Sequence, residues 1–265
     1  MAILDGDVSF TGPLGNLSAY RMRGVDRIIL RRKGGPSKKK IKTSERFDLV
    51  RRNNSEFGGR AVDDKWVMRG MKRIKHLGDY NISGPLNALM KPLQLLSTNV
   101  RGQRDVLLSR NPKILEGFSL NKNVPFDAVV RIPVHCFIDR TNRSARIEIP
   151  ALVAGINLFT PKNNPMYALT ISLGAIPDIK YKGEDLGYRP VDGYEYAPIE
   201  TSYTDWYPIV KGSPASTIEL KLKHATTDDG FSLIVAIGIR YGQMTDATTI
   251  DEVQQAGSAK VLGMG

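Results

Sequence analysis

The spacing of apolar residues changes once along the chain, and the change separates a helical part from a β part. Between residues 43 and 96, apolar positions recur every three or four residues, which is the period of an amphipathic helix. From about Val124 the period becomes two, as in half-buried strands, and clusters of turn residues separate the segments. The pattern predicts an α+β fold in which a small helical region precedes a C-terminal antiparallel β-sandwich.

Within the helical part, one segment has the clearest pattern. Thr43 or Ser44 is a suitable N-cap for the first helix. Residues 62–77 are predicted to form the strongest helix, because their apolar side chains share one arc: Trp66, Val67, Gly70, Met71, Ile74 and Leu77. A third helix is expected from Ser83 to about Leu96, with a kink at Pro92.

Short alternating segments predict the strands. Before the helices, residues 7–33 alternate around a Gly-Pro turn and predict an extended arm of three short strands, which bury little by themselves. After the helices, the predicted strands are residues 128–132, 134–138, 145–149, 167–173, 217–222 and 231–241. We therefore expect four parts: an extended basic β arm, a basic helical region, a β-sandwich and a tail without periodicity, at residues 1–42, 43–123, 124–243 and 244–265.

Positive charge is concentrated in the first half of the chain. Residues 1–125 hold 25 Lys and Arg against 11 Asp and Glu, whereas residues 126–265 hold 13 against 16. Such an asymmetry indicates two parts with different roles, the basic one facing an anionic partner. Nucleic acid, a membrane surface and an acidic patch on another copy of the protein all fit this description.

Two groups of basic residues are the candidates for an assembly or polyanion contact. The first is the arm, where eight positive charges lie in residues 27–42: Arg27, Arg31, Arg32, Lys33, Lys38, Lys39, Lys40 and Lys42. The second is a helical stripe opposite the apolar arc, formed by Lys65, Arg69 and Lys72 with His76. Each group taken alone is also what a solvated loop or an ordinary surface helix shows.

An acidic segment, residues 178–207, is rich in aromatic side chains. Tyrosine and tryptophan offer large, rigid contact areas and are favoured at interfaces. The candidate aromatic interface consists of Tyr194, Tyr196, Tyr203, Trp206 and Tyr207. A loop that caps the sandwich edge, or a platform for a carbohydrate, would show the same composition.

The sequence lacks the signatures of catalysis. It has no phosphate-binding glycine loop, no nucleophile elbow and no zinc-protease motif, and its three histidines have no metal-ligand spacing. Cys136 alternates with apolar residues on a predicted strand, which favours a small buried side chain. We therefore expect a protein that is not an enzyme and binds no metal or cofactor.

The chain also lacks the signatures of membrane targeting. It starts without a cationic segment followed by an apolar stretch, and no window approaches the roughly 18 apolar residues of a membrane span. These features predict cytoplasmic synthesis without a signal peptide and no membrane span. Release as an assembled particle stays open.

One segment resembles a known family. Residues 15–24 read Gly-x-x-x-x-Tyr-x-x-Arg-Gly and are followed by Arg31, Thr43 and Arg51-Arg52-Asn53. In these residues the chain resembles an uncharacterised family common in Bacteroidetes, mainly over the first 60 positions. The resemblance implies a C-terminal β-sandwich and no known activity.

Three hypotheses follow for function. The first is a self-assembling structural subunit of a filament, shell or ring, held by exchange of the arm and by head-to-tail contacts between basic and acidic surfaces. The second is a nucleic-acid-binding or packaging protein that uses the basic first half. The third is a carbohydrate- or ligand-binding sandwich centred on the aromatic segment.

Overall fold

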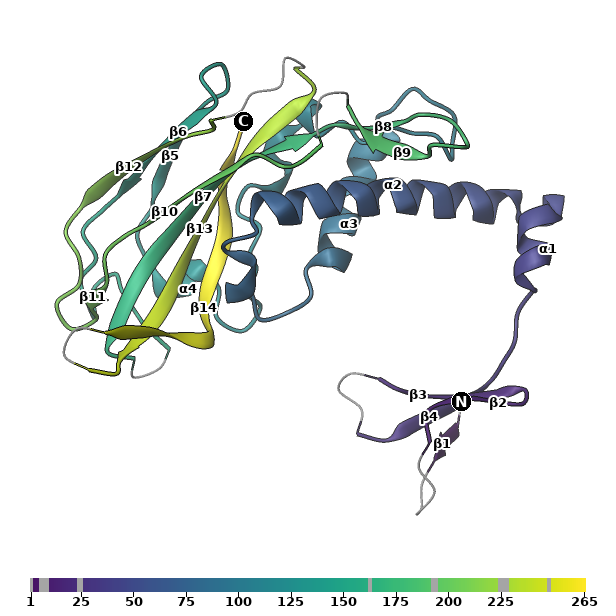
Figure 1. Ribbon diagram of the computed structural model, residues 1–265, viewed down its shortest axis with the longest axis horizontal. Coiled ribbons are helices and arrows are strands. Elements are labelled where there is room, and N and C mark those ends of the chain that lie inside the picture. The colour runs from purple at the N-terminus through teal and green to yellow at the C-terminus, as the bar shows by residue number, and fades with distance from the viewer. Residues whose placement is uncertain are drawn as a thin grey trace. The chain divides into compact units, whose positions relative to one another are not determined.

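The computed structural model describes residues 2–4, 10–22, 26–161, 164–191, 195–223, 229–246 and 249–265. The chain forms two compact units, residues 1–51 and residues 52–265 (Figure 1). Helix α2 starts in the first unit and continues into the second.

The first unit is a small antiparallel sheet followed by short helices. The sheet has the strand order β1-β4-β3-β2, and its strands are β1 (Ala2–Leu4), β2 (Gly12–Leu14), β3 (Leu17–Arg21) and β4 (Ile28–Arg32). Gly15 has a φ of +53° in the turn between β2 and β3, a conformation that favours glycine. The helices are α1 (Lys38–Thr43), η1 (Glu45–Phe47) and the start of α2 (Asp48–Gly70).

Two side chains fix the ends of α1. The hydroxyl of Ser37 accepts a hydrogen bond from the backbone N–H of Lys40 at 3.2 Å and caps the N-terminus of the helix. At the other end, Nη1 of Arg51 donates to the carbonyl oxygens of Ile41 and Ser44 at 2.9 and 2.8 Å. A helix of only six residues is marginal in water, so these caps carry much of its stability.

The second unit begins with helices and contains three sheets. The helical elements after α2 are η2 (Lys75–Leu77), α3 (Ser83–Leu95), η3 (Leu108–Arg110), η4 (Pro112–Leu115) and α4 (Phe126–Val129). The strands are β5 (His135–Asp139), β6 (Ser144–Ile149), β7 (Met166–Pro177), β8 (Ile179–Tyr181), β9 (Tyr188–Pro190), β10 (Ile199–Tyr203), β11 (Tyr207–Pro208), β12 (Ser216–Lys221), β13 (Phe231–Met244) and β14 (Ile250–Met264).

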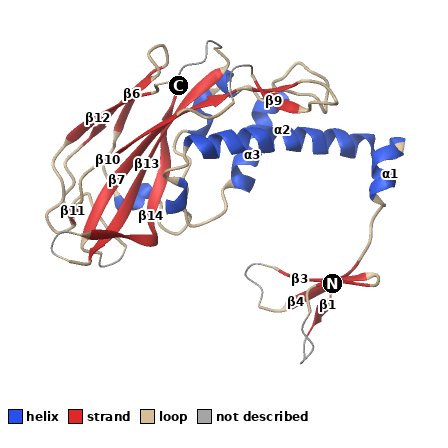
Figure 2. Ribbon diagram, in the orientation of Figure 1, coloured by secondary structure: helices blue, strands red, loops and turns tan. Residues whose placement is uncertain are grey.

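All strand pairs are antiparallel. A five-stranded sheet has the order β10-β7-β13-β14, with β11 also pairing with β7, and a three-stranded sheet has the order β12-β6-β5. The strands β8 and β9 form a separate hairpin. The three-stranded sheet and the helices α2 and α3 lie on opposite sides of the five-stranded sheet (Figures 1 and 2).

The central strands β7 and β13 are buried on both faces because a layer covers each face. Every residue of β7 is buried, as are the first nine residues of β13. On the helix side, a Cβ at Gly174 would lie 2.7 Å from Cα of Gly70, so α2 meets β7 almost backbone to backbone. On the other side, a Cβ at Gly263 of β14 would lie 3.4 Å from Sγ of Cys136 in β5. The core is therefore a three-layer stack.

The predicted fold class is confirmed. The chain combines helices with antiparallel sheets, and the two larger sheets of the second unit belong to one apolar core. The predicted helix within residues 62–77 corresponds to the C-terminal part of α2 and the η2 turn, and α3 covers the segment predicted from Ser83.

Three expectations from the sequence are corrected. The predicted tail, residues 244–265, contains the 15-residue strand β14, which pairs with β13. The predicted boundary after residue 123 falls inside one unit, because helical side chains such as Met71 and Leu86 share the core of the sheets. Residues 128–132 are not a strand: α4 occupies residues 126–129, where a helical turn buries Phe126 and Val129 together.

Candidate cationic sites

The basic residues of the predicted arm lie on the surface of the first unit. All eight are exposed: Arg27, Arg31, Arg32, Lys33, Lys38, Lys39, Lys40 and Lys42. Arg31 places its guanidinium 5.4 Å from the centre of the Tyr20 ring, and Nζ of Lys33 donates to the carbonyl of Gly15 at 3.0 Å. The four lysines of α1 belong to a helix that has no buried residue, so their side chains are accessible to water or to a partner.

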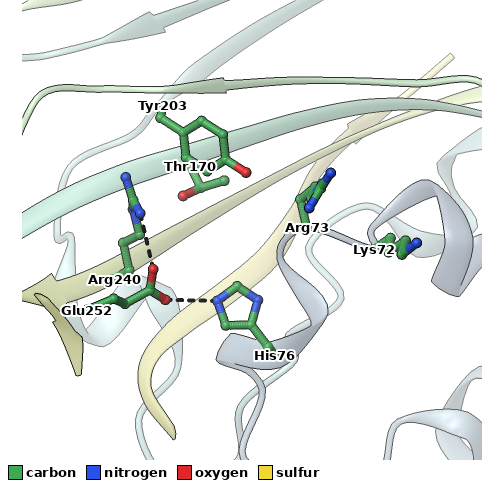
Figure 3. A pocket seen from close by; sticks show the side chains of 7 residues that line it. All are labelled: Lys72, Arg73, His76, Thr170, Tyr203, Arg240 and Glu252. Carbon is green, nitrogen blue, oxygen red and sulfur yellow. Dashed lines mark hydrogen bonds and ion pairs between the residues drawn. The ribbon is translucent and has the colours of Figure 1, made fainter. Parts of the chain in front are cut away.

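In the second unit, a pocket of about 440 Å³ lies between the turns that follow α2 and strands of the five-stranded sheet. Lys72, Arg73 and His76 line it from the turns that follow α2. The sheet contributes the residues on the other side, which are Thr170 of β7, Tyr203 of β10, Arg240 of β13 and Glu252 of β14 (Figure 3).

Glu252 ties the helical side of the pocket to the sheet. Its Oε1 accepts from Nε2 of His76 at 3.0 Å, and its Oε2 accepts from Nη1 of Arg240 at 3.1 Å (Figure 3). The Arg240 and Glu252 side chains are 17% and 25% exposed, so their ion pair is shielded from water more than a surface pair is. One carboxylate therefore holds two basic side chains in place.

Aromatic rings orient the same arginine. The Arg240 guanidinium lies 4.8 Å from the ring centre of Tyr203 and 4.6 Å from that of Trp206. Cation–π contacts of this kind stabilise a guanidinium without using its hydrogen-bond donors. Nε of Arg240 is buried and has no acceptor within the described residues, so one donor of this side chain is unused.

The pocket carries a surplus of positive charge. Lys72, Arg73 and Arg240 are permanent cations, and Glu252 is the one carboxylate among the lining residues. Lys72 and Arg73 are exposed, and neither forms an ion pair with any residue that the structure describes. Coulomb attraction for an anion is therefore not cancelled locally.

This pocket unites two groups of residues that the sequence suggested separately. Lys72 belongs to the predicted helical stripe and Tyr203 to the predicted aromatic interface, and Trp206 contacts the pocket through Arg240. Lys65 is exposed on α2, and Arg69 lies over the Trp66 ring at 5.1 Å; neither lines the pocket.

The other predicted aromatic residues lie elsewhere. Tyr207, in β11, packs near Tyr167 with ring centres 5.9 Å apart. Tyr196 is 61% exposed and precedes β10, whereas Tyr203 ends that strand. Tyr194 falls outside the described residues. Of the four that the structure describes, Tyr203 and Trp206 lie beside Arg240, whereas Tyr196 and Tyr207 do not line the pocket.

Sequence reasoning missed the sheet side of the pocket. Arg240 is the one charged residue of the apolar strand β13, and a lone charge in such a strand is a usable signal. Glu252 carried no signal, because it belongs to the segment that was expected to be a tail.

A second cationic pocket, of about 570 Å³, lies between α2 and α3. Two of its four basic side chains are held by amide groups: Nε of Arg60 donates to Oδ1 of Asn87 at 2.9 Å, and Nη2 of Arg101 donates to Oδ1 of Asn53 at 2.8 Å. Arg60 also donates to Oε1 of Gln94. These bonds make the second pocket a network that joins two helices.

Two buried acids lie on α2 near this network. Asp63 is fully buried, and neither carboxyl oxygen has a hydrogen-bond partner among the described residues. Burial raises the pKa of Asp63 well above its usual value, and the nearby Asp64 and Asp178 raise it further. Burial also raises the pKa of Asp64 to about 6, although its hydrogen bond with Asn87 opposes the shift.

Other chemistry-bearing groups are not assembled into a site. Burial, with a smaller contribution from Glu116, raises the pKa of the Cys136 thiol to about 11, so it is protonated at neutral pH. Over the described residues, no group of His, Cys, Asp and Glu side chains is placed to hold a metal ion. None of the described helices is both long and apolar enough to cross a membrane.

No family model, curated protein or solved structure matches the chain. The resemblance seen in residues 15–24 therefore stays an expectation, and functional inference depends on the chain's own residues.

Proposed function

We propose that the protein is a non-enzymatic structural subunit that assembles with copies of itself. In this proposal, residues 1–51 of one copy contact residues 52–265 of another. The contact is head to tail, so repetition generates a ring or a filament rather than a closed dimer.

The observation that carries this proposal is the small core of the first unit. Where burial is described within residues 1–51, only Ala19, Ile28 and Ile29 are buried. A four-stranded sheet with so little buried apolar surface offsets only part of the entropy lost on ordering the chain. A neighbouring copy that covers this sheet would supply the missing burial.

The strand order of this sheet supports the same contact. Its edge strands, β1 and β2, are three residues long and each has one neighbour. The outer backbone groups of an edge strand can pair with a strand of another molecule. Leu14 in the edge strand β2 is 59% exposed, so an apolar side chain accompanies this edge.

Charge favours a basic-to-acidic contact. Residues 1–51 hold 12 Lys and Arg against 5 Asp and Glu. Within the second unit we place the contact on residues 126–265, which hold 13 Lys and Arg against 16 Asp and Glu. Opposite signs on two surfaces speed the encounter between copies and set its orientation. Repulsion between the basic first units of two copies also disfavours a contact in which these two units pair with each other.

A charge-reversal pair tests this proposal. We expect the full-length variant Lys38→Glu, Lys39→Glu, Lys40→Glu to form smaller assemblies than the natural protein in sedimentation velocity. Glutamate matches lysine in helix propensity and these residues are exposed, so α1 can persist. The control variant changes the net charge by the same amount but replaces exposed lysines of the second unit: Lys113→Glu, Lys180→Glu, Lys211→Glu.

The control is expected to assemble as the natural protein does. Equal loss of assembly in both triple variants would mean that net charge, rather than α1, controls association. Unchanged assembly in the first variant would remove α1 from the contact.

Nucleic-acid binding is the second candidate, and one observation favours it. Besides the basic first unit, the second unit has two pockets whose linings contain three and four Lys or Arg residues. Phosphate contacts give binding that weakens steeply with salt. Copurified nucleic acid that accounts for the mass of the assemblies would favour this candidate over self-assembly.

A further inference from the structure

We propose that the pocket formed by Lys72, Arg73 and Arg240 binds a phosphate monoester, that is, a small molecule with a terminal phosphate group. The inference concerns the second unit alone and is independent of assembly through residues 1–51.

The charge of the pocket fits a phosphate monoester. Three permanent cations against the carboxylate of Glu252 leave a surplus of two positive charges. A phosphate monoester carries −1.5 to −2 at pH 7, about the opposite charge, whereas a single carboxylate carries −1. Arg73 can also donate two parallel hydrogen bonds to phosphate oxygens, while Lys72 acts as a point charge.

Arg240 is already held in place before any ligand arrives. Glu252 binds its Nη1 at 3.1 Å, and the rings of Tyr203 and Trp206 lie within 5 Å of its guanidinium. A ligand therefore does not have to order this side chain, and preorganisation of this kind strengthens binding.

Two hydroxyl groups complete the lining. Thr170 is 1% exposed, and Tyr203 is 49% exposed. Figure 3 shows both side chains on the sheet side of the pocket, and the exposed Tyr203 hydroxyl can donate to a phosphate oxygen. The volume of about 440 Å³ lies in the range of small-molecule sites and leaves room for a sugar or base beyond the phosphate.

Calorimetric titration of the full-length, nuclease-treated protein tests the proposal. The probes are AMP, glucose 6-phosphate and inorganic phosphate, with adenosine and glucose as matched compounds that lack phosphate. We expect the phosphate compounds to bind and the matched compounds not to bind. A preference for AMP or for glucose 6-phosphate over inorganic phosphate would identify the group that occupies the rest of the pocket.

Three single variants locate the site. Lys72→Gln and Arg73→Gln each remove an exposed lining cation that has no ion pair within the described residues, so folding is preserved. We expect each to weaken binding about tenfold, as loss of a charge-assisted hydrogen bond does. The matched control is Lys75→Gln, which removes the same charge from an exposed residue two or three positions away that does not line the pocket. Its effect should stay below about twofold, because an exposed side chain that does not line the pocket acts on the ligand only through water of high dielectric constant.

Two results would overturn the proposal. One is absence of binding for all three phosphate compounds at millimolar concentration. The other is an equal loss of binding in Lys75→Gln and Arg73→Gln, which would indicate a diffuse polyanion surface. The mass of the particle does not enter these outcomes, so the ligand site and self-assembly can fail separately.

Discussion

Two adjacent glycines in α2 give a sharp test of how this helix packs. Gly58 is exposed, and a Cβ there would meet no heavy atom within 4 Å. Gly59 is buried, and a Cβ there would lie 2.6 Å from Cε1 and 2.7 Å from Cδ1 of Tyr188. The same substitution to alanine should therefore have opposite effects at neighbouring positions.

The structure sets the size of each effect. Alanine at Gly58 should stabilise the second unit by about 1 kcal/mol, the difference in helix propensity between the two residues. At Gly59 that gain is opposed by overpacking, which costs about 1–3 kcal/mol. Tyr188 cannot swing aside freely, because its hydroxyl donates to the carbonyl of Gly102 at 3.2 Å and its ring packs edge-on against Tyr181. Loss of that hydrogen bond adds about 1 kcal/mol to the cost.

Urea unfolding followed by tryptophan fluorescence measures both variants. Trp66 and Trp206 both belong to residues 52–265, so the signal reports the unit that contains the two glycines. We expect Gly58→Ala to raise the midpoint and Gly59→Ala to lower it, with a difference of about 2–4 kcal/mol between them. Equal stabilisation by the two variants would refute the packing of α2 on Tyr188.

Three further predictions concern the core of the second unit. Because burial raises the pKa of Asp63, the contribution of this carboxyl group to folding is most favourable below about pH 4, the ordinary range of aspartate, and weakens as pH rises from there. Asp63→Asn should therefore gain stability relative to the natural protein between pH 4 and pH 7 in urea unfolding, and a constant difference would contradict this. Gly174→Ala should destabilise the unit by about 3 kcal/mol, since its Cβ would lie 2.7 Å from the backbone of Gly70; a loss below about 1 kcal/mol would refute this close approach. Deletion of residues 250–265 should abolish the cooperative unfolding transition, because it removes β14 from the sheet, whereas a dispensable tail would leave the midpoint unchanged.

Local patterns predicted most of the long elements. The apolar arc that ends in Leu77 and the alternation in residues 145–149 each arise from one buried face, and a buried face leaves a periodic signal. The strand β13 carried a further signal that went unused. Its apolar run, from Leu233 to Ile239, is continuous rather than alternating, which is typical of a strand covered on both faces.

The strand β14 could not be predicted from periodicity, for a structural reason. Its pairing with β13 shifts register between Val235 and Ala236 and again between Arg240 and Gly242. A bulge adds an unpaired residue and reverses the side-chain alternation on each side of it. Its outer edge is also bonded by a loop, through the backbone of Gly117 and Leu120.

The cationic pocket could be predicted only in part. The stripe that contains Lys72 was visible because residues 62–77 have the apolar period of a helix, and Tyr203 stood out in an aromatic segment. Lys72 and Tyr203 come together through the packing of Gly70 against Gly174, two residues that lie more than a hundred positions apart in the chain. A packing contact of this kind leaves no periodic signal in a single sequence.

Light scattering of the nuclease-treated protein at low and high salt tests self-assembly, because it measures the mass of the particle. The 260/280 nm absorbance ratio, recorded in the same experiment, reports bound nucleic acid. We expect a particle several times heavier than the 29.3 kDa chain, free of nucleic acid and lighter at high salt. A monomer at both salt concentrations would contradict this expectation.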